Sequence, residues 1–539
     1  MSTSTSKKSP QARPAWPVWD ASAAAHLLSR AAFGATPEEA RRLAAMPMAK
    51  AVDALIDAAT RAAAPASPKW VREPWINTER VWADTADEQR RENHRAAGRR
   101  QRDEAEELRA WWLNRMIKTD GPLRETMTLF WHNHFTSAYN KVFMSQPLYH
   151  QNVLFRQSAL GNFRALLGAT LTDSAMMLYL DMEDSDKKQP NENLARELCE
   201  LFTLGDGNYK EKDVREIARA LTGWTLDAPP GADIPRGKEG PPSFRGSKRD
   251  GIVAKFIPER HDDGEKTVLG HTGKFGVKEV ADILAAQPAT ARMVAKKMIH
   301  FFGAIDPQGA LQKRLAETFT ANAKSETQMA AVLRTLLTAP EFYAAEARGA
   351  QIKSPVHLLV GACRQLKLEV EPTPNLAYYV GALGQHLFDP PNVKGWPGGR
   401  NWLNAGTMAT RMHIGEVLLD SEQLAGLEPL GRTRFAPLSR DEEKAKQTMA
   451  AVADFEMEGR AKRNAVGIKC RFNPSALFAQ GPPDKPAALV DALLAHLLAR
   501  PVQPATRETL LQLVSATPPA ARVTEAVRLI LAAPEYQMA

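Results

Sequence analysis

Two carboxylates and an amide recur at helical spacing in residues 190–205. Asn193, Glu197 and Glu200 stand at i, i+4 and i+7, which aligns them along one face of a helix. If that face is buried, the two like charges need a metal ion, an arginine or a shared proton beside them. Glu197 and Glu200 are therefore our candidates for catalytic acid or base, with Asn193 as a neighbouring substrate ligand.

The same segment carries its own helix boundaries. Asn191 is a good N-cap, and Gly205 is suited to end the helix. Arg196 stands four residues after Glu192, so it predicts either an ion pair within the helix or a cationic contact for a substrate. In the first case the remaining carboxylates contact solvent or arginines elsewhere.

Two histidines follow a predicted helix that begins near Pro122. His132 and His134 stand two residues apart in the run FWHNHF, which places them about 200° apart on a continuous helix. They can share a metal ion only if the helix loosens there, as the polar residues after it would allow. The alternative is that each imidazole is hydrogen-bonded separately in a polar core.

A turn motif, His-Asp-Asp-Gly, begins at His261. Asp and Gly favour turn conformations, so the motif is a turn in its own right. His261 and Asp262 become metal ligands only if the fold brings them near His132 or Glu197, where one imidazole could complete a three-ligand site with an open position. Carboxylate and histidine sets between helices suit zinc, manganese or iron.

The segment 384–402 is rich in Gly, Pro and Asn and carries two tryptophans, a lysine and an arginine. A loop of this kind can cover a pocket and offer a tryptophan as a stacking surface for a sugar or a heterocycle. On this interpretation Lys394, Trp396, Arg400 and Trp402 bind the substrate. The alternative is that both tryptophans fill the helical core.

Apolar residues recur at spacings of three and four along most of the chain. This predicts a mainly α protein, a large multi-helix globular domain with long Gly/Pro-rich loops and at most a small β-hairpin. Thr36 and Glu39 predict a capping box, and residues 87–107, dense in charges of both signs, predict a solvated helix. Residues 252–256 and 267–270 are the best candidates for strands, which would pair as the hairpin.

The same patterns divide the chain into three parts. We expect a disordered polar tail at 1–20, a main helical domain over 21–430, and a helical C-terminal part over 431–539 that packs on the main body. Residues 228–251 hold many Pro and Gly, which favours an exposed and mobile loop insertion. Residues 384–406 form the second irregular segment, with the two tryptophans.

Composition and charge exclude several classes of protein. The formal net charge of +8 over 539 residues is modest and no Lys/Arg block with interleaved aromatics occurs, so nucleic acid is not an expected partner. No apolar run is long enough to span a membrane. Cys199, Cys363 and Cys470 lie too far apart for a disulfide framework or a CxxC metal site, and no secretory leader follows Lys7 and Lys8. We therefore expect a cytoplasmic protein whose ligand is a small molecule or a glycan, and the sequence leaves its oligomeric state open.

Several motifs occur together in an order that is familiar. They are HLLSRAAFGATP at 26–37, WHNHF at 131–135, NEN at 191–193 with ARELCEL at 195–201, HDDGEK at 261–266 and PPNVKGWPGG at 390–399. Together they resemble the bacterial domain of unknown function 1800 family over nearly the whole chain. The resemblance implies a shared architecture, while the family's biochemical activity is not established. Members often look exported through a twin-arginine-type leader, which is not recognised here, and often show a His-Pro pair where this chain has Gln287 and Pro288, so that position supplies no ligand.

These observations lead to one leading hypothesis and two alternatives. The leading hypothesis is a metal-dependent hydrolase whose pocket gathers His132, His134, Glu197, Glu200 and His261 around one or two divalent ions, with a glutamate as general base. The Glu-x-x-His spacing of di-iron bundles is absent, which disfavours a metal-dependent oxidase. The other alternative is a non-catalytic protein that binds a glycan or takes part in a protein assembly.

Overall fold

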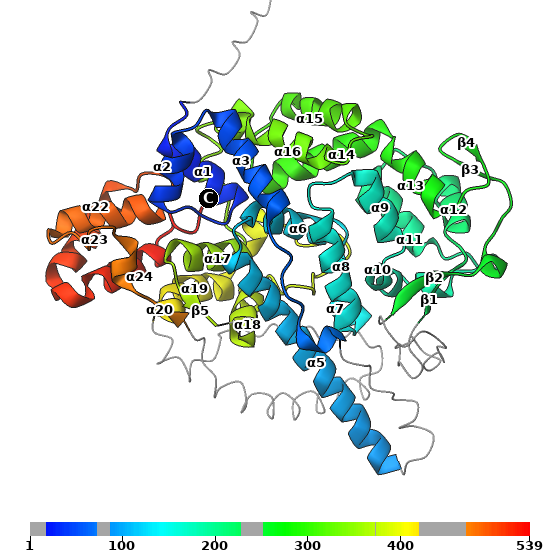
Figure 1. The fold of residues 1–539 in the computed structure, drawn as a ribbon, viewed down its shortest axis with the longest axis horizontal. Helices are drawn as coiled ribbons and strands as arrows, with labels where there is room; N and C mark the ends of the chain where they lie inside the picture. Colours follow the sequence, from blue (N-terminus) through cyan, green and yellow to red (C-terminus); the bar gives the residue numbers. More distant parts are fainter. Residues whose placement is uncertain (1–17, 73–86, 228–251, 372, 420–469) are drawn as a thin grey trace, which may run out of the picture.

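The chain folds as a mainly α-helical protein, which confirms the predicted fold class (Figure 1). The computed structural model describes residues 18–72, 87–227, 252–371, 373–419 and 470–539. Of the expected polar tail at 1–20, residues 1–17 lie outside the described residues, while Asp20 caps the first helix; the predicted loop insertion at 228–251 lies outside the described residues entirely. Among the helices that the structure describes, none combines the length and the apolar composition that a membrane span requires.

The N-terminal helices form one end of the fold. They are α1 (Ala21–Ala31), α2 (Pro37–Ala44), α3 (Met48–Arg61), the short 3-10 helix η1 (Lys69–Arg72) and the long α5 (Asp87–Lys118). The predicted capping box of α2 is confirmed, because the Thr36 hydroxyl accepts from the Glu39 amide and the Glu39 carboxylate accepts from the Thr36 amide. The predicted charged helix is the first part of α5, which extends away from the other helices in Figure 1.

The central helices follow α5 and carry most of the candidate residues. They are α6 (Pro122–His134), α7 (Tyr139–Val142), α8 (Ser145–Gln157), α9 (Phe163–Leu171), α10 (Ser174–Tyr179), the 3-10 helix η2 (Met182–Asp184), α11 (Glu192–Glu197), the π-helix η3 (Leu198–Thr203) and α12 (Glu211–Ala220). Asn191 caps α11 as predicted, by accepting a hydrogen bond from the Asn193 amide. Gly205 follows the π-helix with a positive φ of 78°, which suits a glycine at a helix end.

Short antiparallel pairs are the only sheets in the described part of the chain. β1 (Trp224–Asp227) pairs with β2 (Val253–Phe256), β3 (Lys266–Val268) with β4 (His271–Gly273), and β5 (Glu369–Val370) with β6 (Cys470–Arg471). The two predicted strands therefore exist, but the prediction that they pair with each other was wrong. The 3-10 helix η4 (Pro258–Arg260) and a turn separate them, and Leu269 and Gly270, with positive φ, turn the chain directly from β3 into β4.

The second half of the chain packs on the helices of the first half, and its last helices lie beside α1. Its helices are α13 (Val277–Ala285), α14 (Pro288–Phe302), α15 (Ala310–Ala321), α16 (Gln328–Leu337), η5 (Pro340–Phe342), α17 (Pro355–Gln365), α18 (Pro374–Ala382), η6 (Gly399–Trp402), α19 (Ala405–Met412), α20 (Ile414–Leu419), η7 (Pro474–Leu477), α22 (Pro486–Leu497), α23 (Pro504–Ala516), η8 (Pro519–Ala521) and α24 (Arg522–Ala532). In Figure 1, α22, α23 and α24 lie beside α1 and α2, at the end of the molecule opposite β1 to β4.

One continuous hydrophobic core runs from α1 to the last helix. Gln365, at the end of α17, joins the C-terminal helices to this core. Its Nε2 donates to the carbonyl oxygens of Ala35 (3.2 Å) and Leu497 (3.1 Å), and its backbone oxygen lies 2.8 Å from His496 Nε2. The Tyr536 hydroxyl donates to Gln365 Oε1 at 3.0 Å. One buried side chain therefore ties together segments from both ends of the chain.

Candidate functional site

His134 supports the backbone of the π-helix. Its Nε2 lies 3.1 Å from the carbonyl oxygen of Phe202, which can only accept, so Nε2 carries the proton. Its Nδ1 then accepts from Lys297 Nζ at 3.0 Å, and the same ammonium donates to the Leu201 carbonyl at 2.7 Å. Both ring nitrogens of His134 are thereby occupied. Burial, together with the Lys297 charge, holds the pKa of His134 well below its usual range, and burial lowers the pKa of Lys297 to about 8.

His132 supports a different segment. Its Nε2 accepts from the Phe388 amide at 3.3 Å, and its ring packs against the rings of Trp112, Phe388 and Trp396. Burial lowers the pKa of His132 to about 3. The Nδ1 atom carries the remaining proton and has no hydrogen-bond partner within the described residues. The only lone pair of this neutral ring is therefore already used.

Asn133, between the two histidines, fixes the backbone at Trp396. Its Oδ1 accepts from the Trp396 amide at 2.7 Å, and its Nδ2 donates to the Trp396 carbonyl at 3.4 Å. A Cβ at Gly395 would lie 2.3 Å from Asn133 Oδ1, and the φ of Gly395 is +79°, so no other residue fits there without strain. His132, Asn133 and His134, hereafter the clamp, thus hold two segments that are distant in sequence.

The clamp belongs to a continuous helix. α6 continues through His134, and the Phe135 amide still bonds to the Trp131 carbonyl at 2.8 Å. The helix does not loosen in the way that a shared metal ion would require, so the two imidazoles leave α6 in different directions, one to Phe388 and the other to Phe202. The structure matches the alternative in which each histidine is hydrogen-bonded separately.

The two segments held by the clamp carry charged residues that meet beside α7 and α10. Four acids, two lysines and an asparagine form this surface, hereafter the carboxylate cluster: Asp181, Glu197, Glu200, Asp389, Lys141, Lys394 and Asn193. Lys394 Nζ lies 3.6 Å from Glu200 Oε1. Lys141 Nζ lies 2.7 Å from Asp181 Oδ2, and Asn193 Nδ2 donates to the same oxygen at 3.4 Å. The cluster therefore joins the predicted residues Asn193, Glu197, Glu200 and Lys394.

Glu197 is the acid of the cluster without a partner. It is half-buried, and nothing in the described part of the chain donates a hydrogen bond to its carboxylate or forms an ion pair with it. Burial and the neighbouring charge of Glu200 raise the pKa of Glu197, against the smaller opposing effect of Lys394. Burial, with the charges of Asp389 and Glu197, also raises the pKa of Tyr179 to about 12, which places the phenol beside both acids.

The backbone around the cluster departs from regular geometry at three points. Glu200 lies in the π-helix, where the amides of Leu204 and Gly205 both bond to the Cys199 carbonyl. Asp181 and Phe388 have positive φ values of 56° and 60°. A bulky residue with a positive φ is strained. Such backbone strain and π-helical turns concentrate at functional sites. The strained Phe388 directly precedes Asp389, whose Oδ1 accepts from the Asn140 amide at 3.1 Å.

Other predicted substrate ligands are paired with residues outside the cluster, buried, or exposed. Arg196 pairs with Glu192 (3.1 Å) on its own helix and with Glu211 (2.7 Å) on α12, as in the alternative ion-pair interpretation. Trp396 and Trp402 are only 6% and 7% exposed, so neither indole offers an open stacking face. Arg400 is exposed at the start of η6.

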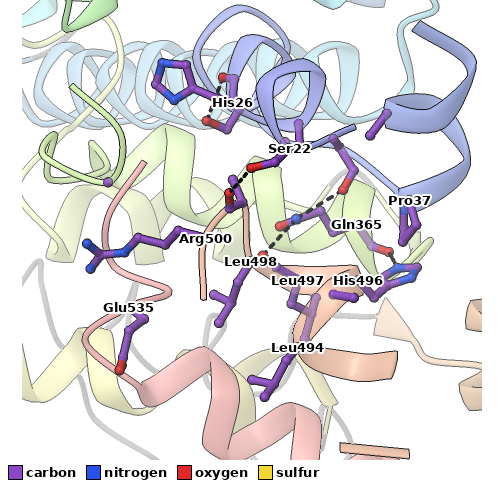
Figure 2. A pocket seen from close by; sticks show the side chains of 18 of the residues that line it. Ser22, His26, Pro37, Gln365, Leu494, His496, Leu497, Leu498, Arg500 and Glu535 are labelled. Carbon is purple, nitrogen blue, oxygen red and sulfur yellow. Dashed lines mark hydrogen bonds between the residues drawn. The ribbon is translucent and has the colours of Figure 1, made fainter. Parts of the chain in front are cut away.

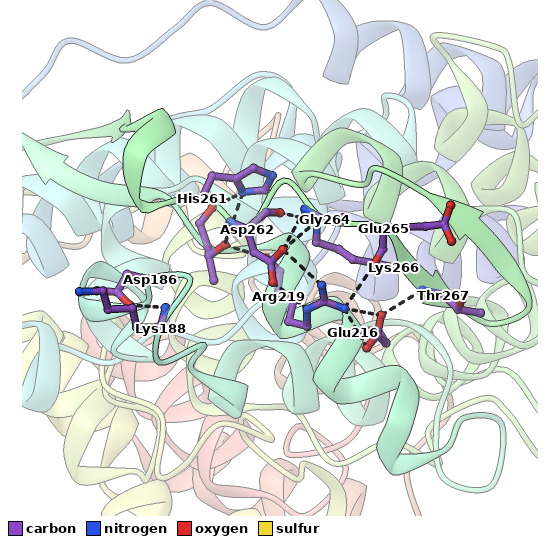
Figure 3. Close-up of polar contacts among 11 residues, drawn as sticks. Asp186, Lys188, Glu216, Arg219, His261, Asp262, Gly264, Glu265, Lys266 and Thr267 are labelled. Atoms are coloured by element: carbon purple, nitrogen blue, oxygen red, sulfur yellow. Dashed lines mark hydrogen bonds and ion pairs between the residues drawn. The ribbon is translucent and has the colours of Figure 1, made fainter.

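His261 and Asp262 belong to a separate network on α12 (Figure 3). His261 Nδ1 lies 2.9 Å from the Thr222 carbonyl, so it donates there. Asp262 accepts from Arg219 Nε at 2.7 Å and from Arg219 Nη2 at 3.2 Å, which holds the pKa of Asp262 below its usual range. The buried Lys266 donates to the carbonyl oxygens of Asp262 and Gly264. These bonds fold the His-Asp-Asp-Gly turn onto α12.

The described residues contain no group of three or more His, Cys, Asp or Glu side chains that could hold a metal ion. The predicted ligands His132, His134, His261 and Asp262 each bond to other protein groups instead. A divalent metal, whether zinc, manganese or iron, stays a prediction.

Some residues of the site escaped the sequence analysis. Lys297 sits in an ordinary amphipathic helix, and nothing local marks it as the partner of a histidine 163 residues earlier. Lys141 lies in the short helix α7 and Asp181 directly precedes η2, and neither belongs to a recognisable sequence motif. Asp389 offered a weak signal, because it directly precedes two prolines in the Gly- and Pro-rich segment 384–402.

Comparison with known proteins gives a single match. Residues 26–538 match the family described as "Protein of unknown function (DUF1800)". No curated protein and no solved structure matches the chain. The matched residues include the clamp, the carboxylate cluster and the α12 network. The chain therefore belongs to the DUF1800 family.

Proposed function

We propose that the carboxylate cluster is the active site of a hydrolase in which Glu197 exchanges a proton with the substrate. Glu197 carries this proposal, because it is a half-buried carboxyl with a raised pKa and no partner of its own. Such a group keeps its proton to a higher pH than an ordinary glutamate and can give it to a leaving group. Glu200, whose Oε1 lies 3.6 Å from Lys394 Nζ, is the second carboxylate of the pair and is placed to accept a proton from the attacking water.

The remaining residues of the cluster suggest the class of substrate. Asp181, Lys141 and Asn193 offer donors and acceptors side by side at a partly exposed surface. Hydroxyl groups can both donate and accept, so a polyhydroxylated molecule such as a glycan fits this pattern. The buried tryptophans contribute no stacking face, so we assign recognition to hydrogen bonds from the cluster.

The proposal needs no metal ion. Catalytic zinc sites usually use three protein ligands, and the described residues provide no such group. In the proposed mechanism the carboxylates supply acid and base, and the clamp keeps them in place through the π-helix and the 388–396 segment. His132 and His134 are positioning residues in this scheme.

The test compares two glutamine variants of the same helix. Glu197→Gln should reduce the hydrolysis of nitrophenyl glycosides and polysaccharides, measured as nitrophenol or reducing-end release, by about 10²–10⁴-fold, the usual contribution of a general acid. Glu192→Gln is the matched control, because Glu192 already pairs with Arg196, and its activity should stay near that of the wild type.

Two outcomes would contradict the proposal. In the first, Glu197→Gln turns over a glycan as fast as the wild type. In the second, the wild-type chain binds glycans on an array without hydrolysing any of them, and Glu197→Gln binds equally well. That second result would favour the non-catalytic alternative.

A further inference from the structure

A cavity of about 570 Å³ lies away from the carboxylate cluster, between the two ends of the chain (Figure 2). Its walls come from α1, the start of α2, α22 with the segment after it, residues 348–353 and the last residues of the chain. None of the cluster residues lines it. Its volume falls within the range of about 300–1,000 Å³ that is usual for small-molecule sites.

Lys353 is the feature of this cavity that needs an explanation. Its side chain lines the cavity and is only 6% exposed. Its Nζ lies 3.7 Å from the centre of the Tyr536 ring, and no acceptor for its protons is found within the described residues. A buried ammonium without a hydrogen-bonded anion is costly, and a cation–π contact offsets only part of that cost.

The two arginines near Lys353 do have hydrogen-bond acceptors. Arg30 donates to Gln351, to the Ala347 carbonyl and to the backbone oxygen of Ala539. Arg411 donates to Gln537 Oε1 at 3.1 Å and to the backbone carbonyl of Lys353 itself at 2.8 Å. Each arginine thus donates to acceptors of the fold through its terminal nitrogens, although its Nε has no partner among the described residues. Neither arginine lines the cavity, whereas Lys353 lines it and has no hydrogen-bond acceptor for its ammonium in the described part of the chain.

The other charges on the wall leave a positive excess. Asp491 is neutralised by Arg507 at 2.7 Å. Glu535 accepts from Thr506 Oγ1 at 2.9 Å through Oε1, and its Oε2 has no hydrogen-bond partner among the described residues. Arg500 lies on the same side of the pocket as Glu535 in Figure 2 and lowers the pKa of Glu535. The positive charge of Arg500 therefore partly balances the negative charge of Glu535. Lys353 and Arg348 then remain without a carboxylate on the wall.

We propose that this cavity binds a small organic anion, a carboxylic acid or a phosphate monoester with a short apolar body, whose acidic group pairs with Lys353. The apolar body would lie against Phe33, Leu494 and Leu498, which also line the cavity. The anion supplies the acceptor that the Lys353 ammonium lacks.

Acid–base behaviour provides a signature of this site. Burial and the nearby charges of Arg411 and Arg30 lower the pKa of Lys353 to about 7. Burial, with the charges of Lys353 and Arg30, lowers the pKa of the neighbouring His357 to about 3, so this imidazole does not titrate in the same range. A bound anion favours the ammonium form, so binding takes up a proton above that pH. Affinity for the anion should therefore be greatest below pH 7 and fall as the pH rises above it.

The experiment measures binding of matched probes to the full chain by calorimetry. Benzoate, hexanoate and phenyl phosphate are the anionic probes, and benzyl alcohol and hexan-1-ol are their neutral counterparts. At pH 6 at least one anion should bind about tenfold or more tightly than its neutral counterpart, since a charge-assisted hydrogen bond contributes about 1.5–3 kcal/mol. Comparison of the carboxylates with phenyl phosphate identifies the acidic group that the site prefers.

Two variants place the effect at Lys353. Lys353→Met should weaken binding of that anion about tenfold or more, because it removes the ammonium and keeps the length of the side chain. Arg41→Met is the matched control: Arg41 also lines the cavity but already pairs with Glu38 at 3.2 Å, so the affinity should not change.

The proposal is overturned if the neutral probes bind as well as the anions, if none of the anions binds at millimolar concentration, or if Lys353→Met retains wild-type affinity. Should Lys353→Met fail to fold, the pH series on the wild-type chain decides the matter. Affinity that falls between pH 6 and 9, with proton uptake in buffers of different ionisation enthalpy, supports the site. Affinity that is independent of pH contradicts it.

Discussion

Glu197 shows how burial and a like charge act on one residue. The carboxylate stands three residues before Glu200 and has no partner within the described chain. Its pKa is raised in the folded state, so folding favours the protonated form. The resulting penalty is absent below the unfolded pKa, grows as the pH rises from the unfolded to the folded pKa, and is complete above the folded pKa.

We therefore expect Glu197→Gln to stabilise the protein at pH 7 by about 0.5 kcal/mol, the size of a like-charge pair on a helix. The gain should disappear near pH 3, well below the unfolded glutamate pKa of about 4.3, where Glu197 is protonated in both states. Urea unfolding at the two pH values measures it. Glu192→Gln should instead lose a little stability at pH 7, because it breaks the pair with Arg196. Equal behaviour of the two variants would show that Glu197 carries no such penalty.

Lys297 should make the free energy of unfolding depend on pH in the opposite direction. Burial lowers the pKa of its ammonium to about 8 in the folded protein, whereas an unfolded lysine titrates near 10.4. Between these values the unfolded state binds more protons, so Lys297 makes stability rise with pH in that interval and has no such effect below it.

Lys297→Met should accordingly flatten the increase in unfolding free energy between pH 8 and 10 by up to about one proton equivalent. The variant should also be less stable than the wild type at pH 8, because the Leu201 carbonyl and His134 Nδ1 lose their donor. Lys296→Met, on the exposed side of the same helix, serves as the control and should leave the pH profile unchanged. An unchanged profile in Lys297→Met would place the ammonium outside the buried network.

At the scale of elements, α6 holds two other segments at once. One helical turn directs His132 and Asn133 to the 388–396 segment and His134 to the π-helix. The position of the acids in the carboxylate cluster thus depends on hydrogen bonds made by residues outside the cluster. Small changes in the clamp should move the segments and leave the carboxylates chemically intact.

Asn133→Ala should therefore loosen the 388–396 segment and cost about 1–3 kcal/mol, since it leaves the Trp396 amide buried without an acceptor. Hydrogen exchange of the Trp396 amide should become faster in this variant. In Asn133→Asp the Oδ1 acceptor is retained, so exchange at that amide should stay slow. Fast exchange in the wild type would show that the contact does not restrain the segment.

The sequence predicted the local parts of these elements well and their meeting points poorly. The Thr36 capping box and the Asn191 cap follow from neighbouring residues alone, so their pattern was sufficient. The strand at 253–256 was found, but its partner precedes residues 228–251, and no local pattern encodes that pairing. The two histidines looked like metal ligands because imidazoles and carboxylates mark such sites. Their true partners are backbone groups of Phe202 and Phe388, which have no signature in a sequence.

At the scale of the whole molecule, Gln365 joins the C-terminal helices to the rest of the fold. Its amide bonds to Ala35, Leu497 and Tyr536, which lie on three separate segments. Since the cavity that holds Lys353 lies at this junction, the same contacts define the space for its ligand.

Gln365→Met should destabilise the protein by at least about 2 kcal/mol, because three buried polar groups lose their partner. We also expect urea unfolding, followed by fluorescence and by circular dichroism, to change from one transition to two, as α22 to α24 separate first. Gln512→Met, at an exposed position of α23, should unfold like the wild type. A single transition of unchanged midpoint in Gln365→Met would show that other contacts hold the two parts together.

The distances in sequence between the clamp and its partners have a consequence for synthesis. Asn133 and Trp396 are 263 residues apart, and a ribosome that adds about 5–20 residues per second needs roughly 13–50 s to span them. For that time the end of α6 has left the ribosome while the segment that binds it has not been made. A nascent chain must therefore keep these polar groups hydrated or covered by a chaperone, and the two walls of the carboxylate cluster can meet only late in translation.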